Sequence, residues 1–183
     1  MKEKVKNALL NIKEKFEKNH HTFLGEEDVR CHLFSELLQN FNTLETTKDG
    51  KETIPLHAQF SFFDENRRLK EGEKPDIIIV DVPTTNLYSD ETISYKDRAS
   101  KGFEFEKAPI AIEIKLNWRK KGKTVKNQIS KEIEKIRGIQ ERNPEIFFYL
   151  LYFDKKNRLG DEEIRNINQE LKNIEIIYGK SSN

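Results

Sequence analysis

Short apolar runs, six to nine residues long, constrain the fold of this chain more than any other feature. They are PDIIIVD (75–81), APIAIEIKL (108–116), EIFFYLLYF (145–153) and IEIIYG (174–179). Runs of this length that are rich in β-branched and aromatic residues are typical of strands. The first two are dense in isoleucine, which favours central positions in a sheet. A further segment with strand character, TIPLHAQFSFF (53–63), comes before them, followed by a charged turn.

Helical patterning appears in four other segments. Val5, Leu9, Ile12 and Phe16 recur at helical spacing, which predicts an amphipathic N-terminal helix over 1–18 that packs on the core. The other helices are expected over 26–40, 125–141 and 161–172. The order is therefore two helices, three strands, and then helix, strand, helix, strand, which predicts a mixed α/β sandwich. A length of 183 residues favours one domain spanning the whole chain.

Two polar segments lie between these elements. NFNTLETTKDGKE (40–52) is rich in Asn, Thr, Asp and Gly, which predicts a loop. Residues 82–107 form a longer polar stretch, and loops of that length are usually functional or contain small elements of their own. We expect this stretch to be a mobile flap or small hairpin near the functional site. Its candidate substrate contacts are Tyr88, Tyr95, Lys96 and Arg98.

Composition limits the location of the chain and its partners. Lys and Arg (33) nearly balance Asp and Glu (32), so no global field attracts nucleic acid and any such affinity must come from a local patch. The single cysteine, Cys31, excludes an internal disulfide and fits a reducing compartment, which predicts a cytoplasmic location. The N-terminus contains Glu3 and Glu14 and has no long apolar stretch, so we expect no signal peptide and no membrane contact.

Two charged residues stand inside one of the apolar strands. In IAIEIKL, alternation places Glu113 and Lys115 on one face of the strand, about 7 Å apart at Cα. Charges in so apolar a strand are costly unless they are paired or bind a ligand. Asp76 opens the run PDIIIVD and approaches Glu113 if the two strands are adjacent. Converging carboxylates repel each other unless a hard cation bridges them, which indicates a Mg²⁺ site with Lys115 beside the attacking water.

These residues resemble a known pair of half-motifs. Pro75-Asp76 and Glu113-Ile114-Lys115 look like the signature of the PD-(D/E)XK nuclease superfamily, which has the restriction-endonuclease-like fold. The resemblance implies a three-layer sandwich with a mixed central sheet and an αβββαβ core over about residues 25–155. It also implies an endonuclease that hydrolyses DNA phosphodiester bonds, as in restriction, defence or repair. Asp76 and Glu113 would bind Mg²⁺, with Mn²⁺ as a substitute, and Lys115 would lie by the water.

The first core helix carries a second similarity to this superfamily. Members often have an acidic residue there in a pattern similar to E-x-x-x-R-x-x-L, and GEEDVRCHLF matches it through Glu26, Arg30 and Leu33. The resemblance makes Glu26 an auxiliary metal ligand. Glu27 is the alternative if the helix is rotated by one position. Glu26 is preferred because it shares the helical stripe that should face the sheet.

A third similarity lies on the helix after the lysine strand. Some members carry a D-x-x-K-L-like pattern there, and KEIEKI resembles it through Glu132, Lys135 and Ile136. This chain departs from the pattern, because Glu replaces the Asp and Ile replaces the Leu.

A basic segment lies between the lysine strand and the next helix. Its cations are Arg119, Lys120, Lys121, Lys123 and Lys126. At the mouth of the predicted site they could neutralise DNA phosphates, and the alternative is a solvated loop without a ligand.

Fold does not fix function, so a function from another class stays open. The chain could be a non-cleaving accessory module that binds DNA or protein and keeps the nuclease fold. The intact Asp, Glu and Lys set favours the enzyme, whereas the near-neutral charge favours the accessory role. The sequence does not decide whether the chain forms a homodimer or joins a partner protein subunit.

Overall fold

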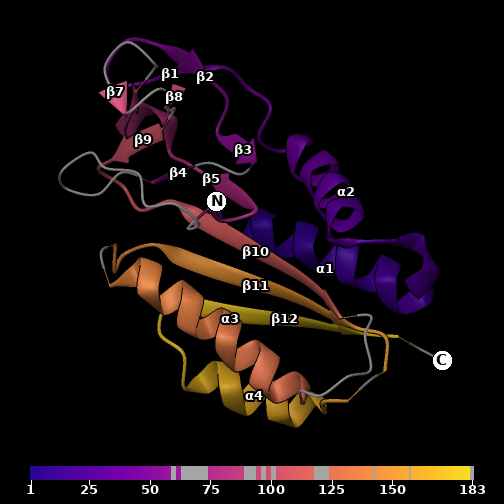
Figure 1. Cartoon of the computed structure of the whole chain (residues 1–183). Helices are drawn as coiled ribbons and strands as arrows, with labels where there is room; N and C mark the ends of the chain where they lie inside the picture. The colour runs from indigo at the N-terminus through magenta and orange to yellow at the C-terminus, as the bar shows by residue number, and fades with distance from the viewer. Residues whose placement is uncertain are drawn as a thin grey trace.

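Figure 1 shows the computed structural model of the chain. It describes residues 1–58, 61–62, 74–88, 94–95, 98–99, 102–117, 124–141, 143–156 and 158–181. The α-helices among them are α1 (Lys2–Lys18), α2 (Glu26–Leu38), α3 (Val125–Gln140) and α4 (Asp161–Gln169). The strands of the main sheet are β3 (Leu56–Ala58), β5 (Ile77–Ile79), β10 (Ile110–Asn117), β11 (Phe147–Asp154) and β12 (Ile174–Lys180).

The main sheet is mixed and has the strand order β12-β11-β10-β5-β3. Strands β10, β11 and β12 run parallel, whereas β5 pairs antiparallel with both β10 and β3. The parallel strands are linked through α3 and α4, as parallel connections require a crossover. The prediction that the isoleucine-rich runs lie centrally is confirmed, because β5 and β10 are interior strands of this sheet.

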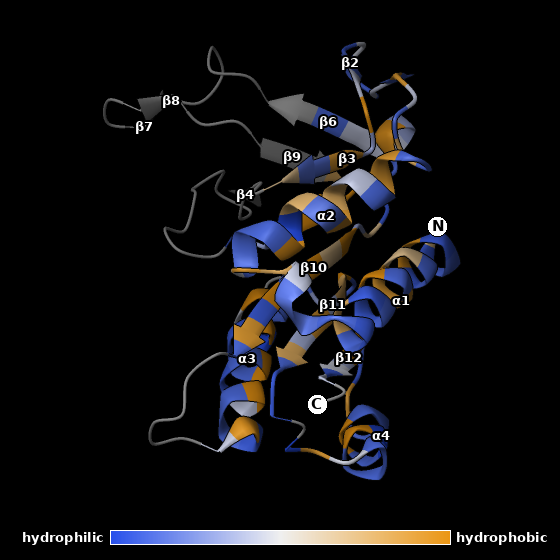
Figure 2. Ribbon diagram, turned by 90° about the vertical axis from the view of Figure 1, so that its right-hand side faces the viewer, coloured by the Kyte–Doolittle hydropathy of each residue, from blue (hydrophilic) through white to orange (hydrophobic). Residues whose placement is uncertain are grey.

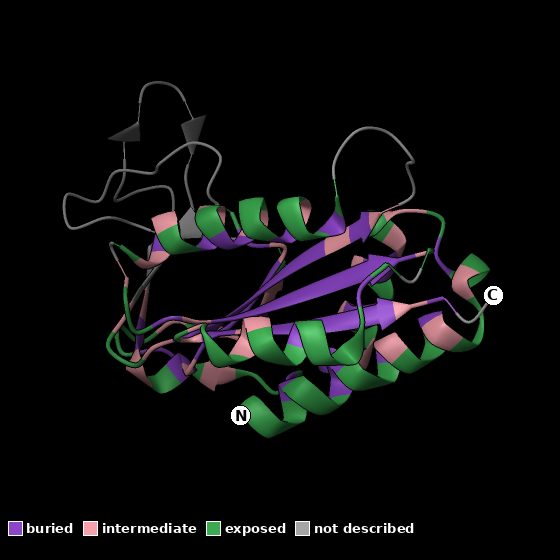
Figure 3. Ribbon diagram, turned by 90° about the horizontal axis from the view of Figure 1, so that it is seen from below, coloured by how far each residue is buried: buried purple, intermediate pink, exposed green. Residues whose placement is uncertain are grey.

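Helices cover both faces of the sheet and make three layers (Figure 1). One buried cluster joins α1 and α2 to the sheet, and a second joins α3 and α4 to the opposite face. In Figure 3 the central strands are buried, and the helices around them carry exposed outer surfaces. The mixed α/β class is therefore confirmed. The more specific restriction-endonuclease-like fold stays a prediction.

Amphipathic patterning explains how the helices pack. Val5, Leu9, Ile12 and Phe16 on α1 are fully buried, which confirms that this helix packs on the core. Hydrophilic and hydrophobic segments alternate along α1 and α3 in Figure 2, as expected for helices with one face on a sheet. No helix within the described residues is long and apolar enough to cross a membrane.

Further short elements lie outside the α-helices and the main sheet, and most of them belong to the two polar segments. These are η1 (His20–Thr22), β1 (Glu45–Thr46), β2 (Glu52–Thr53), β4 (Ser61–Phe62), η2 (Val82–Thr84), β6 (Thr85–Tyr88), β7 (Ser94–Tyr95), β8 (Arg98–Ala99) and β9 (Gly102–Phe105). Strands β6 and β9 pair antiparallel within residues 82–107, and β7 pairs with β8 between them. The segment predicted as a loop over 40–52 contains β1 and the first residue of β2. These two strands form a hairpin, which turns at Gly50 with φ of +79°.

The segment predicted as one strand over 53–63 is divided among three sheets. Thr53 belongs to the β1–β2 hairpin, β3 joins the main sheet, and β4 pairs with β9. Pro55 stands at the first break, where it has no N–H to donate to a strand partner. Its carbonyl accepts a hydrogen bond from the N–H of Val80 at 2.9 Å. The alternating pattern in the sequence did not reveal this division.

Asn168 of α4 covers the outer edge of β12. Its Oδ1 accepts from the N–H of Ile176 at 2.7 Å, and its Nδ2 donates to the carbonyl of Ile176 at 3.0 Å. One side-chain amide therefore satisfies both main-chain groups of that residue, as a neighbouring strand would. Unpaired groups on a strand edge are a template for pairing with another chain. Asn168 thus protects the end of the sheet.

We expect Asn168→Ala to lower the free energy of unfolding by about 1–3 kcal/mol, because both main-chain groups of Ile176 lose their partner. The newly open edge should also promote association that rises with concentration. Denaturant unfolding and light scattering measure the two effects. Gln169→Ala, one position along the helix on an exposed residue, is the control. Unchanged stability and unchanged association would show that the Asn168 contact contributes nothing.

Candidate active site

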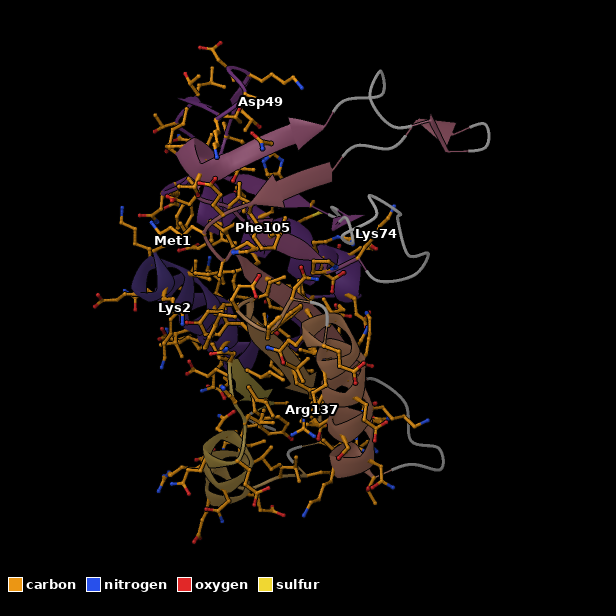
Figure 4. All side chains as sticks on the ribbon, turned by 90° about the vertical axis from the view of Figure 1, so that its left-hand side faces the viewer. Met1, Lys2, Asp49, Lys74, Phe105 and Arg137 are labelled. Atoms are coloured by element: carbon orange, nitrogen blue, oxygen red, sulfur yellow. The ribbon has the colours of Figure 1, made fainter. Side chains whose placement is uncertain are left out.

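Asp76 and Glu113 lie side by side on two paired strands. Ile77 of β5 is opposite Ile112 of β10 in an antiparallel register, so the next pair brings Asp76 beside Glu113. Asp76 Oδ2 accepts a hydrogen bond from the N–H of Ile114 at 2.8 Å, which fixes the carboxylate against β10. In Figure 4, the labelled Lys74 marks the segment that leads into this end of β5. The predicted convergence of these two residues is therefore present.

Strand parity places the side chains of Glu113 and Lys115 on the face of the sheet that α3 covers. Ala111, on the same face of β10 as Glu113 and Lys115, packs in the cluster beneath α3. Ile112 and Ile114 point to the opposite cluster, beneath α1 and α2. The alternation in IAIEIKL thus places a polar stripe, formed by Glu113 and Lys115, on one face of β10 and apolar side chains on the other face.

Glu113 is a buried carboxylate with two lysine partners. Its side chain is only 4% exposed, and its Oε1 lies 2.7 Å from Lys135 Nζ and 3.5 Å from Lys115 Nζ. Burial raises the pKa of Glu113 above its usual value, and the charge of Asp76 adds to the rise. The two lysines oppose this shift. The carboxylate is therefore placed where an additional positive charge would stabilise its ionised form.

Lys115 lies among several carboxylates. Its Nζ is 3.5 Å from Glu113 Oε1 and 3.6 Å from Glu26 Oε2. Burial alone would lower the pKa of Lys115, but the charges of Glu132, Glu26, Glu113 and Asp76 raise it above its usual value. Lys115 is therefore held as an ammonium ion. In that form it can orient a water or stabilise negative charge, but it cannot accept a proton.

Helix α2 brings an acid and an arginine to the same place. Glu26 Oε1 accepts a hydrogen bond from the N–H of Leu116 at 3.2 Å. Arg30, one turn later, donates to Asp76 Oδ1 at 3.2 Å and also forms an ion pair with Glu27. Acidic residues suit the first turn of a helix because of the positive end of its dipole. Glu26, not Glu27, is the residue next to Lys115, and its role as a metal ligand stays a prediction.

Helix α3 supplies the opposite wall of the site. Thr124 caps the helix by accepting a hydrogen bond from the N–H of Asn127. Glu132 and Lys135 then lie about two to three turns along it, where Lys135 bonds to Glu113 and the charge of Glu132 acts on Lys115. Glu132 and Lys135, two residues of the segment that resembles the D-x-x-K-L-like pattern, thus lie at the site. The third, Ile136, is buried in the apolar layer beneath α3.

A hydrogen-bonded network extends the polar stripe along β10, and no sequence motif pointed to it. Gln128 Oε1 accepts from Asn117 Nδ2 at 2.8 Å and from the Tyr152 hydroxyl at 2.5 Å. Burial, followed by the charge of Asp154, raises the pKa of Tyr152 to about 12, so the hydroxyl keeps its proton and donates it. Gln128 and Asn117 are common polar residues without a motif, so only their position in the fold brings them together.

Most of the predicted DNA contacts fall outside the described residues. Arg119, Lys120, Lys121 and Lys123 belong to this group, and so does Lys96. Lys126 lies in the first turn of α3 and is exposed. For Tyr88, Tyr95 and Arg98 the structure describes the backbone alone.

The charges around the site do not balance. Among the described residues, its carboxylates belong to Glu26, Glu27, Asp76, Glu113 and Glu132, and its cations to Arg30, Lys115 and Lys135. Five negative groups and three positive groups leave a formal charge of −2. This excess of negative charge is local, because the whole chain has a formal charge of +1.

The donor set suits a hard divalent cation only in part. Asp76 and Glu113 offer adjacent carboxylates, and Mg²⁺ is commonly held by one or two carboxylates together with water and substrate phosphates. A complete protein cage is not formed: the described residues contain no group of three or more His, Cys, Asp or Glu side chains arranged to hold a metal ion. Glu26 instead bonds to the backbone of β10. The residues therefore fit a two-carboxylate site.

Comparisons of the chain with protein-family models, with curated proteins and with solved structures found no match.

Proposed function

We propose that this chain is a divalent-metal-dependent nuclease that hydrolyses DNA phosphodiester bonds. The observation that carries the proposal is the pairing of Asp76 with Glu113 at one end of adjacent strands, with Lys115 beside them. Two adjacent carboxylates, one of them buried, favour binding of a cation, and Lys115 and Lys135 supply only part of that compensation, since the pKa of Glu113 stays above its usual value. The described residues of the site carry a formal charge of −2, which one divalent ion would neutralise.

Each residue has a distinct part in the proposed reaction. Asp76 and Glu113 would hold Mg²⁺, or Mn²⁺ in its place, and Glu26 would serve as an auxiliary acid. When bound, the ion would polarise the scissile phosphate and lower the pKa of a bound water. Lys115 would orient the attacking water and offset negative charge on the phosphate, consistent with its ammonium form.

DNA is the proposed substrate because a basic segment comes after β10 in the sequence. The segment with Arg119, Lys120, Lys121 and Lys123 follows β10 directly, and Lys126 begins the next helix. Contacts from these residues to phosphates would supply affinity without reading sequence. They would also be needed, because the described residues of the site carry net negative charge, which repels a polyanion.

The proposed fold is the restriction-endonuclease-like one. Its αβββαβ core would correspond to α2, β3, β5, β10, α3 and β11, in that order along the chain. The mixed sheet with helices on both faces supports this correspondence. A homodimer or a complex with a partner subunit is compatible with the proposal, and neither is needed for the chemistry at one site.

The test is cleavage of plasmid and branched DNA by the purified protein. We expect cleavage with Mg²⁺ or Mn²⁺, and none with a chelator or in Glu113→Gln, which keeps the shape of the side chain but removes its charge. Thermal unfolding of Glu113→Gln checks that the variant is folded. If the unmutated protein cleaves no DNA with either metal, the non-cleaving accessory module replaces the nuclease as the better function.

A further inference from the structure

The nearest charged partner of Glu113 comes from the neighbouring helix. Lys135 Nζ of α3 lies 2.7 Å from Glu113 Oε1, whereas Lys115 Nζ, two residues along the same strand, lies at 3.5 Å. The shorter distance is that of a charge-assisted hydrogen bond. Both ammonium groups approach the same carboxylate oxygen. A metal ion at Glu113 would therefore meet positive charge that is already in place.

Such a metal ion and Lys135 would compete for one carboxylate. Glu113 is 4% exposed, so water screens its surroundings poorly and like charges there repel strongly. A divalent ion and an ammonium group at hydrogen-bond distance from the same oxygen would raise the energy of the site. Metal binding at this oxygen would therefore favour displacement of the ammonium group of Lys135.

We infer that Lys135 is an exchangeable internal cation, which balances Glu113 in the free protein and releases it when a divalent metal binds. The inference rests on the proposed function, since it takes Glu113 as a metal ligand. It makes Lys135 a determinant of the metal affinity of the site, although it is not a ligand.

Among the three cations that the structure describes at the site, Lys135 is the one best able to leave. Its side chain is 35% exposed, compared with 28% for Lys115 and 15% for Arg30. Arg30 is shared between Asp76 and Glu27, and Lys115 lies between Glu26 and Glu113. The flexible stem of Lys135 can carry its ammonium group from the rim of α3 into water, where it is well solvated.

The exchange also explains how a buried carboxylate is tolerated before metal binds. Removing one partner of a buried ion pair leaves an uncompensated charge, which is strongly destabilising. Lys135 supplies that compensation to Glu113 in the free protein. Arg30 and the N–H of Ile114 likewise compensate the charge of Asp76. The site is thus stable without metal, at the expense of metal affinity.

The test is calorimetric titration with Mg²⁺ or Mn²⁺ alone, without DNA, on the unmutated protein and on Lys135→Gln. Competition predicts that Lys135→Gln binds metal about tenfold more tightly or better, because close charge pairs couple by more than the equivalent of one decade. Titration at pH 8 limits competition by protons at Glu113. Arg137→Gln is the matched control, since Arg137 is an exposed cation on the same helix (Figure 4). It should change the affinity by less than about twofold, because solvent screens its charge.

A second measurement uses the unmutated protein and does not depend on the variant folding. The ammonium group of Lys135 should give an NMR signal that is protected from exchange by its bond to Glu113, and saturating Mg²⁺ should remove that protection. Persistence of the signal, or metal affinity in Lys135→Gln equal to or below that of the unmutated protein, would overturn the exchange. Absence of metal binding, or undiminished binding in Glu113→Gln, would overturn the exchange and the proposed metal site together.

Discussion

Lys115→Ala should reduce DNA cleavage by about a hundredfold or more, while metal binds at least as tightly as in the unmutated protein. The carboxylates of Asp76 and Glu113 remain in this variant, and one positive charge next to them is gone. Lys115→Met should behave alike and keeps most of the packing of the aliphatic stem. A lysine whose ammonium form is favoured by four nearby carboxylates acts through its charge, and both variants lack that charge.

Two further variants separate the roles of the site residues. Asp76→Ala should weaken metal binding and cleavage together, because it removes a proposed ligand. It also leaves the N–H of Ile114 and the guanidinium of Arg30 without this acceptor, so its stability must be measured too. Lys121→Ala should mainly weaken DNA binding and reduce its salt dependence, since a phosphate contact acts through counterion release.

The measurements are metal titration by calorimetry, DNA binding at several salt concentrations, and cleavage of plasmid and branched DNA. The pattern across the variants carries the assignment more than any single loss of activity. Full cleavage by Lys115→Ala would remove that lysine from the mechanism. Equal metal affinity in Asp76→Ala and the unmutated protein would remove Asp76 from the ligand set.

The positions of the main site residues could be predicted from local patterns. Alternation in a strand fixes which residues share a face, so Glu113 and Lys115 had to point the same way. The apolar run after Asp76 indicated a strand that starts at that residue, and adjacent pairing brought the two carboxylates together. The helical stripe that favoured Glu26 over Glu27 also agrees with the structure, where Glu26 reaches β10.

The cations that balance these carboxylates could not be assigned in the same way. The motif similarities include Arg30 and Lys135 but assign no partner to either, and in a chain so rich in Glu and Lys either side chain could have faced solvent. Their partners lie 46 and 22 residues away in the sequence, so the pairs depend on how α2 and α3 pack against the sheet. Short strands such as β2 and β4 are equally difficult, because two paired residues leave no periodic signal.

Asp154→Ala should lower the free energy of unfolding by about 3 kcal/mol, which corresponds to roughly 6–12 °C in the melting temperature of a chain this long. Asp154 is fully buried at the end of β11 and has a bidentate pair with Arg158, with contacts of 2.8 Å and 3.1 Å. Its carboxylate also accepts from the Tyr178 hydroxyl and from the N–H groups of Lys156 and Arg158. The expected loss is at the lower end for a buried pair, because Arg158 can reach solvent.

Removing a surface carboxylate should lower the free energy of unfolding much less than removing a buried one. Asp161→Ala is the matched control, because Asp161 is also paired with a basic residue, Lys180, but lies on the exposed surface of α4. Solvent screens that pair, so its removal should cost much less stability. Thermal and denaturant unfolding compare the two variants. Equal losses would mean that the burial and bidentate pairing of Asp154 add nothing to its contribution.

The contribution of Asp154 should also depend on pH in a defined direction. Burial alone would raise the pKa of Asp154, but the hydrogen bonds from Arg158, Tyr178 and the backbone hold it below its usual value. A pKa lower in the folded than in the unfolded state stabilises the fold above the unfolded value, about 3.9. That stabilisation is lost as the pH falls through the folded value. The difference in unfolding free energy between the unmutated protein and Asp154→Asn should therefore be constant near pH 7 and shrink below about pH 4. A difference that stays the same down to pH 3 would show that the ionised carboxylate has no special role at this position.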